Sequence, residues 1–428
     1  MKIAVAGTGY VGLVAGVCFS EVGHNVVCVD VNEKKIEMLK KGISPIYEQN
    51  LEEMMMRNYS AGRLDYTTDY ASAYKGCDVI FIGVGTPERE DGSANLKYVF
   101  QSAKQIAEAI TKNCIVVVKS TVPIGTNDEI EKYIKDNLKE NVVVDVVSNP
   151  EFLAQGTAVK DTLYASRIII GTENERAKQV MLEVYKDFKC PILCTNRRSA
   201  EMIKYASNDF LALKISYMND IANLCEMVGA DVVDVAKGMS YDNRIGDKFL
   251  NAGCGYGGSC FPKDTKALHF LAGQSGYELK TVKAAIEVNR AQKVVLIKKA
   301  RQVFPSFEGL KVAVLGLTFK PGTDDLREAP SIDNIKILLA EGAIINAYDP
   351  VGIPNCKRIF PQEINYVDSP IKALCDADCC FIFTEWDEIK KLTFDDFFTH
   401  MKNPVVFDGR NIYSKDEMKK IKYYSIGR

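Results

Sequence analysis

The sequence predicts an α/β protein with two doubly wound domains joined by a central helical domain that contains one long helix. Short β-branched runs alternate with longer amphipathic stretches from the first residue onward. A stretch almost free of glycine and proline follows residue 198, and the opening pattern returns near residue 311. Strands that alternate with helices favour a parallel sheet covered by helices on both faces.

The N-terminal part carries the signals of one such sheet. Apolar runs rich in β-branched residues predict buried strands at Lys2–Ala6, Asn25–Val29, Val79–Val84, Ile115–Lys119, Val142–Val147 and Arg167–Ile170. Periodicity and length predict helices at Asn32–Lys41, Leu96–Thr111 and Asn127–Asn137.

The middle of the chain is predicted to be helical. Between Ser199 and Val228, apolar side chains recur at helical spacing, at Met202, Ile203, Ala206, Phe210 and Leu213. A second helical run, Leu279–Val303, follows a glycine-rich loop.

The C-terminal part repeats the opening theme. Lys311–Gly316 resembles Lys2–Gly7, and Ala377–Phe383 resembles Cys77–Ile82. A Glu-Gly pair precedes Asp349 much as Glu21 and Gly23 precede Asp30. Any two strand–helix units share some features, but three similarities in the same order favour a second domain of the same kind.

Length and composition set the remaining bounds. At about 150 residues per domain, 428 residues suggest two or three domains, and we expect them at 1–198, 199–300 and 301–428. The formal charge of −2 argues against a nucleic-acid partner. The sequence has no apolar run long enough to predict a membrane span. Without an export signal, the 13 cysteines are interpreted as reduced thiols of a cytoplasmic protein, and 3 histidines favour no metal site.

A glycine motif predicts a dinucleotide site. Gly7-Thr8-Gly9-Tyr10-Val11-Gly12 lies between a predicted strand and a predicted helix, and Asp30 ends the second strand. Such a turn lets the backbone approach a pyrophosphate at the helix N-terminus, and the acidic residue binds a ribose 2′-hydroxyl. NAD is therefore expected rather than NADP, and the domain is Rossmann-like. Lys35 either reaches the adenosine ribose or is a solvated lysine.

The corresponding turn in the C-terminal part, Gly316–Lys320, lacks the glycine triplet. It predicts a poorer dinucleotide site that holds a different nucleotide-bearing group.

The loop Gly253-Cys254-Gly255-Tyr256-Gly257-Gly258-Ser259-Cys260-Phe261-Pro262-Lys263-Asp264 is the strongest candidate for chemistry. Proline suits the first turn of a helix, so Cys260 is expected at a helix N-terminus with Lys263 nearby. The helix N-terminus and the positive charge of Lys263 both favour the thiolate form of Cys260, which is the nucleophilic form. Cys254 lacks that context and is interpreted as structural.

Lys204 and Asn208 are four residues apart and so share one face of the long helix. A cation and a neutral donor suit the stabilisation of an oxyanion. An exposed lysine with a polar neighbour is the alternative, and spacing does not choose between them.

These motifs together resemble the UDP-glucose/GDP-mannose dehydrogenase family along nearly the whole chain. The resemblance rests on the glycine motif and the cysteine loop, together with Gly85-Thr86-Pro87, Lys119-Ser120-Thr121-Val122-Pro123, Asn149-Pro150-Glu151-Phe152-Leu153, Phe319-Lys320 and Asp408-Gly409-Arg410. The segment Arg244–Leu250 and the loop ending Gly257-Gly258-Ser259-Cys260 resemble the members that oxidise UDP-glucose.

The resemblance implies an NAD-dependent, twofold oxidation of UDP-glucose at C6 to UDP-glucuronate. Cys260 would form a thiohemiacetal with the intermediate aldehyde, because the aldehyde has no second hydride to give until a nucleophile adds to it. Oxidation then yields a thioester that water hydrolyses. Lys204 and Asn208 would stabilise oxyanions, Asp264 would orient the water or Lys204, and Thr121 and Glu151 would organise that water.

The resemblance also implies the binding residues. Cofactor contacts would be Gly7, Thr8, Gly9, Tyr10, Val11, Gly12, Asp30, Lys35, Thr86, Thr121, Lys263 and Arg327. Substrate contacts would be Glu151, Phe152, Leu153, Ala154, Gln155, Lys204, Asn208, Arg244, Phe249, Leu250, Asn251, Ala252, Gly253, Tyr256, Gly257, Phe319, Lys320 and Arg410. Arg244 would come from the partner subunit of a homodimer formed through the central helices.

One position departs from the family pattern. The family motif usually ends Phe-Leu-x-Glu-Gly, whereas this chain has Gln155 before Gly156. Glutamine takes no proton, so a positioning role is favoured there over a general base. Two alternative functions stay open, a sister enzyme acting on GDP-mannose or another nucleotide sugar and a non-catalytic nucleotide-sugar sensor.

Overall fold

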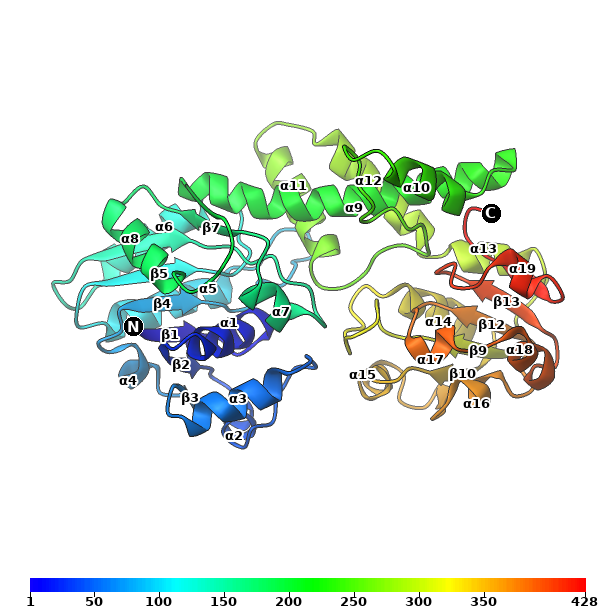
Figure 1. Cartoon of the computed structure of the whole chain (residues 1–428), viewed down its shortest axis with the longest axis horizontal. Coiled ribbons are helices and arrows are strands. Elements are labelled where there is room, and N and C mark those ends of the chain that lie inside the picture. Colours follow the sequence, from blue (N-terminus) through cyan, green and yellow to red (C-terminus); the bar gives the residue numbers. More distant parts are fainter. The chain divides into compact units, whose positions relative to one another are not determined.

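The computed structural model describes all residues, 1–428, and divides into two compact units, Met1–Ser207 and Asn208–Arg428. Each unit is built around one sheet with helices on both faces (Figure 1). This confirms the predicted fold class. The three-domain division at residues 198 and 300 stays a prediction.

The first unit contains a sheet of eight strands in the order β3-β2-β1-β4-β5-β6-β7-β8. Its strands are β1 (Lys2–Ala6), β2 (Asn25–Val29), β3 (Leu64–Thr67), β4 (Val79–Ile82), β5 (Cys114–Val118), β6 (Val144–Ser148), β7 (Ile168–Gly171) and β8 (Ile192–Thr195). The pairings are parallel except between β6 and β7, where Ser148 pairs with Gly171 in the antiparallel sense. The prediction of a wholly parallel sheet is wrong at that pair, because β7 runs back after the short α7.

The helices of the first unit are α1 (Tyr10–Glu21), α2 (Glu33–Lys40), α3 (Leu51–Ser60), α4 (Tyr70–Tyr74), α5 (Lys97–Ala109), α6 (Thr126–Asn137), α7 (Ala158–Leu163) and α8 (Glu175–Val184). The long helix α9 (Arg197–Val228) starts in this unit and ends in the second. The sequence analysis did not predict β3, β8 or the short α4, because runs of four or five residues carry little periodic signal.

Two hydrophobic cores lie on opposite faces of the first sheet. Val5 and Phe81 belong to one core, whereas Ala4 and Ile80, their neighbours on β1 and β4, belong to the other. Successive side chains of a strand point to opposite faces, so a sheet covered on both faces needs apolar residues at consecutive positions. The continuous apolar runs seen in the sequence follow from this requirement.

The second unit contains a six-stranded parallel sheet in the order β11-β10-β9-β12-β13-β14. Its strands are β9 (Lys311–Leu315), β10 (Ile344–Tyr348), β11 (Ile364–Tyr366), β12 (Cys379–Ile382), β13 (Val405–Asp408) and β14 (Lys422–Tyr424). Its helices are α10 (Val232–Ser240), α11 (Phe261–Gln274), α12 (Lys280–Gln292), α13 (Val295–Arg301), α14 (Pro330–Ala340), α15 (Ile353–Ile359), α16 (Pro370–Leu374), α17 (Asp387–Lys390), α18 (Phe394–His400) and α19 (Lys415–Met418).

The helical run predicted at Leu279–Val303 is two helices, α12 and α13, separated at Lys293 and Val294. The prediction of one run is wrong there. Val294 has φ −108° and ψ 14°, which are not helical values, and the Asn334 amide donates a 2.7 Å hydrogen bond to the carbonyl oxygen of Lys293 at this break.

The internal repeat is confirmed at the level of hydrogen bonds. Asp78, just before β4, accepts a bond from the N–H of Lys2 at 2.8 Å, and Asp378, just before β12, accepts one from the N–H of Lys311 at 3.0 Å. In both sheets an aspartate therefore links the first strand to its inner neighbour, β1 to β4 in the first sheet and β9 to β12 in the second. No helix combines the length and the apolar character needed to cross a bilayer.

Candidate active site

The glycine motif forms the turn between β1 and α1. Gly7 has a positive φ of 98°, and a Cβ on Gly12 would lie 2.1 Å from the carbonyl oxygen of Gly7. A Cβ on Gly9 would meet no atom within 4 Å, so the space above it is open. No side chain caps α1 and no acidic residue lies in its first turn. The N–H groups of this uncapped first turn and the open space above Gly9 fit the pyrophosphate of a dinucleotide.

Asp30 follows β2 and faces the same turn. Its carboxylate accepts bonds from the backbone N–H of Thr8 at 3.0 Å, the hydroxyl of Thr8 at 2.6 Å and the N–H of Asn32 at 3.0 Å. Burial acts to raise the pKa of Asp30, but these hydrogen bonds outweigh it and lower the pKa. The Lys35 ammonium lies 3.7 Å from the Asp30 carboxylate, so the two predicted cofactor residues are brought together.

Thr86 and Thr121 lie beyond the carboxyl ends of β4 and β5. The Thr86 hydroxyl donates to the carbonyl oxygen of Thr121 at 2.8 Å. Ligands of doubly wound sheets bind at this edge. The structure therefore places both predicted cofactor residues beside each other.

Glu151 and Lys204 form a buried ion pair in the first unit. Lys204 Nζ lies 2.8 Å from Glu151 Oε1, and their side chains are 3% and 7% exposed. The other Glu151 oxygen accepts from the N–H of Leu153 at 2.8 Å. Breaking such a pair leaves an uncompensated buried charge, so each residue holds the other in place. The reading of Lys204 as an exposed lysine is wrong.

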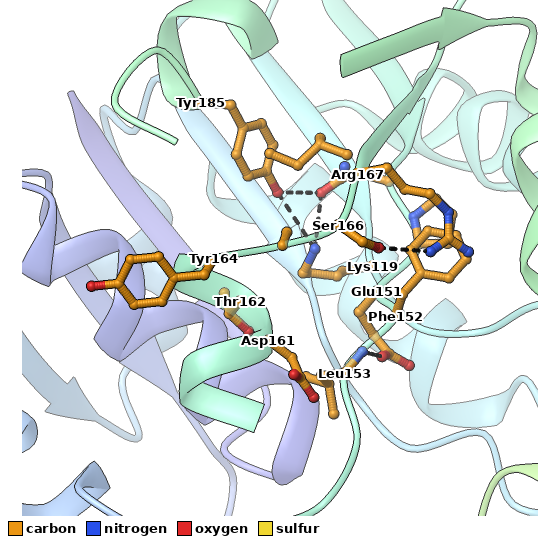
Figure 2. A pocket seen from close by; sticks show the side chains of 14 residues that line it. Lys119, Glu151, Phe152, Leu153, Asp161, Thr162, Tyr164, Ser166, Arg167 and Tyr185 are labelled. Carbon is orange, nitrogen blue, oxygen red and sulfur yellow. Dashed lines mark hydrogen bonds between the residues drawn. The ribbon is translucent and has the colours of Figure 1, made fainter. Parts of the chain in front are cut away.

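The Phe152 ring lies against two cations. The Arg167 guanidinium is 3.7 Å from the ring centroid and Lys204 Nζ is 5.5 Å from it. Figure 2 shows the Arg167 side chain against this ring. The stacking holds the backbone of the predicted substrate segment against the loop before β7.

A cavity of about 260 Å³ adjoins this segment, lined among others by Lys119, Glu151, Tyr164, Arg167 and Tyr185 (Figure 2). Lys119 Nζ donates to Asn149 Oδ1 at 3.1 Å inside it. Burial lowers the pKa of Lys119 to about 8. Lys119 ends a predicted strand and belongs to a family motif, but no role was predicted for it from the sequence, because a lysine at a strand end carries no signal of its burial.

Cys260 is the residue before α11, and Pro262 lies in the first turn of that helix. The prediction of a cysteine at a helix N-terminus is confirmed. The hydroxyl of Ser259 is 3.8 Å from Cys260 Sγ. Lys263 Nζ lies 2.5 Å from Asp264 Oδ1, so the Lys263 charge is shared with a carboxylate one residue away.

Asn208 and Asp264 join α9 to α11. The Asn208 amide donates to Asp264 Oδ2 at 2.7 Å, and both side chains are buried. The neighbouring Asp209 is buried as well, and neither of its carboxylate oxygens has a hydrogen-bond partner. Burial, helped by the nearby Asp264 carboxylate, raises the pKa of Asp209 to about 8. Asp209 was not predicted to be a site residue, because a carboxylate next to an asparagine in a helix is normally interpreted as solvated.

The glycine loop before Cys260 is held by amide side chains. Asn219 Oδ1 accepts from the N–H of Gly253 at 2.8 Å, and Asn289 Oδ1 accepts from the N–H of Tyr256 at 2.8 Å. A Cβ on Gly257 would lie 2.4 Å from the carbonyl oxygen of Glu328, so only glycine fits there. Cys254 is fully buried, in agreement with its structural interpretation.

Arg410 connects this loop to the second sheet. Its guanidinium donates to the carbonyl oxygens of Phe383, Gly255 and Phe319 at 2.7, 3.3 and 3.2 Å. A second cavity, of about 400 Å³, is lined by Arg410 and by further predicted substrate residues, Leu250, Asn251 and Ala252. The structure therefore brings these predicted substrate residues to one place in the second unit.

Other predicted residues are placed separately. Arg244 is 90% exposed and pairs with Asp242, and Phe249 has a positive φ of 64° and is 40% exposed. Arg327 donates to both oxygens of Asp325, at 2.9 and 2.7 Å. Lys320 Nζ lies 5.7 Å above the Phe319 ring.

The turn after β9 differs from the dinucleotide turn after β1. Asp349, the counterpart of Asp30, accepts from the N–H groups of Leu317 and Thr318 and from the Trp386 indole at 2.7, 3.1 and 3.1 Å. Its side chain is buried, so no oxygen is left for a ribose hydroxyl. The prediction that this turn is the poorer dinucleotide site agrees with this geometry.

These features define a dinucleotide-binding α/β oxidoreductase with a second, altered nucleotide fold and a cysteine at a helix N-terminus. Three domain profiles of one family match the chain: the NAD-binding domain at residues 1–189, the central domain at 198–291 and the UDP-binding domain at 313–415. The chain belongs to the UDP-glucose/GDP-mannose dehydrogenase family.

Similar proteins cover the chain from end to end. The UDP-glucose 6-dehydrogenases YwqF and TuaD of Bacillus subtilis are 48% and 47% identical over 430 and 429 residues, covering 100% of this chain and 98% and 93% of theirs. The structure of a UDP-glucose dehydrogenase from Pyrobaculum islandicum matches with a TM-score of 0.93 at 37% identity, covering 99% of this chain and 96% of the other.

Proposed function

We propose that this protein is an NAD-dependent UDP-glucose 6-dehydrogenase that oxidises the C6 alcohol of UDP-glucose twice and releases UDP-glucuronate. The observation that carries the proposal is Cys260 at the start of α11, one turn before an Asp264 that is held by Asn208. The proteins that match end to end at 48% and 47% identity bear the name UDP-glucose 6-dehydrogenase, which supports this choice of sugar nucleotide.

Each residue has a defined task in the two oxidations. The first removes hydride from C6 and a proton from its hydroxyl and leaves an aldehyde. Cys260 Sγ then adds to the aldehyde carbon, whose oxygen takes up a proton, and the thiohemiacetal forms. NAD accepts one hydride at each oxidation. Lys204 and Asn208 stabilise negative charge on the sugar oxygen, because both are buried donors.

The second oxidation converts the thiohemiacetal to a thioester, with loss of hydride and of the hydroxyl proton. Water attacks the carbonyl carbon, the C–S bond breaks, and the Cys260 thiolate leaves. Asp264, oriented by Asn208 and Lys263, positions that water. The family resemblance assigns Glu151 and Thr121 to the organisation of the same water. Gln155 carries no transferable charge and is assigned to positioning.

Different groups of residues bind NAD, the sugar and the nucleotide part of the substrate. We propose that the glycine motif, Asp30, Lys35, Thr86 and Thr121 bind NAD, and the family resemblance adds Lys263 and Arg327. The segment 151–155 and the loop 249–257 take the sugar, and Lys320 and Arg410 bind the nucleotide part. The geometric support is the cavity formed by Leu250, Asn251, Ala252 and Arg410.

A homodimer through the central helices is part of the proposal. Phe210, Tyr217 and Leu224 are 61%, 53% and 53% exposed on α9 and lie seven residues apart. Two turns separate successive members, so the three side chains share one helix face. An exposed apolar stripe of this kind favours a protein partner, and a second copy of this chain would present Arg244 to the sugar. A cytoplasmic location stays a prediction from the free cysteines.

The stoichiometry of the reaction tests the function. We expect about two NADH for each UDP-glucose consumed, with UDP-glucuronate as the product. GDP-mannose and UDP-N-acetyl sugars serve as comparison substrates. One NADH per sugar, or turnover only with another sugar nucleotide, contradicts the proposal. Binding of UDP-glucose without any NADH formed would favour the sensor instead.

A further inference from the structure

Glu48 is a buried carboxylate to which the proposed reaction assigns no role. It lies between α2 and α3, is 9% exposed and has no lysine or arginine partner. Its oxygens instead accept hydrogen bonds from neutral groups: the Tyr10 hydroxyl, the N–H of Gly156 at 2.8 Å and the N–H of Ala158 at 2.8 Å. A buried charge satisfied only by neutral donors depends on each of them.

The three donors come from the two motifs that bind different ligands. Tyr10 is the first residue of α1, inside the glycine motif. Gly156 directly follows the segment 151–155, and Ala158 begins α7. The N–H of Gly156 also lies 3.0 Å from the Tyr10 hydroxyl oxygen, which makes a second link between the motifs.

The backbone of Gly156 adds to the constraint. Its φ is +87°, a conformation that residues with a side chain adopt at a cost. The bond from its N–H to Glu48 holds the chain in this conformation just after Gln155. A change at Tyr10 therefore reaches the end of the 151–155 segment through one carboxylate.

We propose that Glu48 is a positioning residue that couples occupation of the dinucleotide motif to the geometry of the 151–156 segment. The proposal rests on the function given above, in which the first motif binds NAD and the second binds the sugar. A dinucleotide on the glycine motif orders the start of α1, and Glu48 holds Gly156 and Ala158 to it. The second ligand then meets a segment that is already ordered, which is positive coupling.

Isothermal titration with NADH and UDP-glucose measures this coupling without turnover, because NADH accepts no hydride. In the wild-type protein we expect saturating NADH to tighten UDP-glucose binding at least about fivefold, the lower end of typical coupling. In Glu48→Gln one carboxylate oxygen becomes an NH₂ group that accepts no bond, so either Tyr10 and Gly156 or Ala158 loses its acceptor. One link of the chain between the two motifs is then broken, and we expect the ratio of the two dissociation constants to fall toward one.

Glu52→Gln is the matched control. Glu52 accepts a 2.9 Å bond from the N–H of Ser44 in the same connection but touches neither motif, so its variant should keep wild-type coupling. Thermal unfolding of each variant separates a folding defect from lost coupling. Should Glu48→Gln fail to fold, Tyr10→Phe breaks the same link at its other end and should also reduce the ratio.

The outcomes separate the two proposals. Equal coupling in the wild type and in Glu48→Gln, or none in the wild type, overturns the role of Glu48. Failure of the wild type to bind UDP-glucose at all overturns the proposed function. Loss of coupling together with unchanged NADH affinity in Glu48→Gln supports the positioning role, because a merely structural residue would weaken both ligands alike.

Discussion

The amide of Asn208 donates a 2.7 Å hydrogen bond to Asp264, and this bond joins the long helix α9 to the first turn of α11. The second oxygen of Asp264 is bound by Lys263 at 2.5 Å. With both oxygens engaged, the carboxylate has one orientation, and Cys260 lies one helical turn before it. The long helix therefore orients the start of the helix that carries the nucleophile.

Replacing Asn208 by Ala removes one of the two groups that hold Asp264. We expect kcat to fall by about 100-fold or more, because a buried carboxylate oxygen loses its donor and an oxyanion loses its stabiliser. Steady-state kinetics with UDP-glucose measures the effect. Asp395→Asn, at an exposed position of α18 in the same unit, should change kcat by less than about twofold; a comparable loss there would point to a general defect of the second unit.

Replacing Cys260 by Ser should stop the reaction after the first oxidation. A hydroxyl at this place is a far weaker nucleophile toward the aldehyde, so we expect no more than one NADH per sugar and no UDP-glucuronate. UDP-glucose binding should persist. Cys254→Ala in the same loop should still give two NADH per sugar, at a stability cost of about 1 kcal/mol for the cavity. Full turnover to acid by Cys260→Ser would rule out the covalent route.

Asp209 predicts a pH-dependent stability. Burial and the nearby Asp264 raise its pKa to about 8 from an ordinary value of 3.8. Between these pH values the folded state binds a proton that the unfolded chain has released, so the contribution of Asp209 to stability falls as pH rises from about 4 to about 8. Asp209→Asn should remove that loss.

Denaturant unfolding at pH 5 and pH 8 tests this sign. We expect Asp209→Asn to be more stable than the wild type by on the order of a few kcal/mol at pH 8 and by clearly less at pH 5. Asp395→Asn, the same substitution at an exposed position of α18, is the matched control and should not gain stability in this way. A wild-type advantage that grows with pH would mean that Asp209 is ionised and favourably bound in the folded state.

The exposed stripe of α9 predicts the effect of a charge on assembly. Leu224→Glu places a carboxylate in the proposed dimer face, and burying it unpaired is costly, so we expect a shift from dimer to monomer in sedimentation velocity. Val31→Glu, at a valine that is 72% exposed in the first unit, is the control. A dimer that survives Leu224→Glu unchanged places the interface elsewhere.

Much of the fold could be predicted from local patterns. Two consecutive apolar residues such as Ala4 and Val5 point to opposite faces, and both faces of the sheet are buried. Such runs, with glycines at the turns, indicate a doubly wound sheet from one sequence. The similarity of Ala377–Phe383 to Cys77–Ile82 predicted a second domain of the same kind, and in each domain an aspartate of this segment accepts a bond from the first residue of a strand.

Other features could not be predicted from the sequence, because they depend on contacts with residues far away along the chain. At the break after α12, the carbonyl oxygen of Lys293 is bound by Asn334, which is 41 residues away in the sequence. Glu48 bonds to Ala158 across 110 residues, and the Asp264 carboxylate that helps to raise the pKa of Asp209 belongs to a different helix, α11. No periodicity or spacing within a segment reports such contacts.

The sequence by itself determined which residue types stand at the ends of strands and helices, and hence the class of fold, the dinucleotide motif and the cysteine at the start of α11. The tertiary structure alone decided the burial and the hydrogen-bond partners of side chains such as Lys119, Asp209 and Glu48. The physical reason is that strand and helix patterns are set by neighbours within a few residues. The burial and the hydrogen-bond partners of a side chain are set by segments that are distant in the sequence and pack against it.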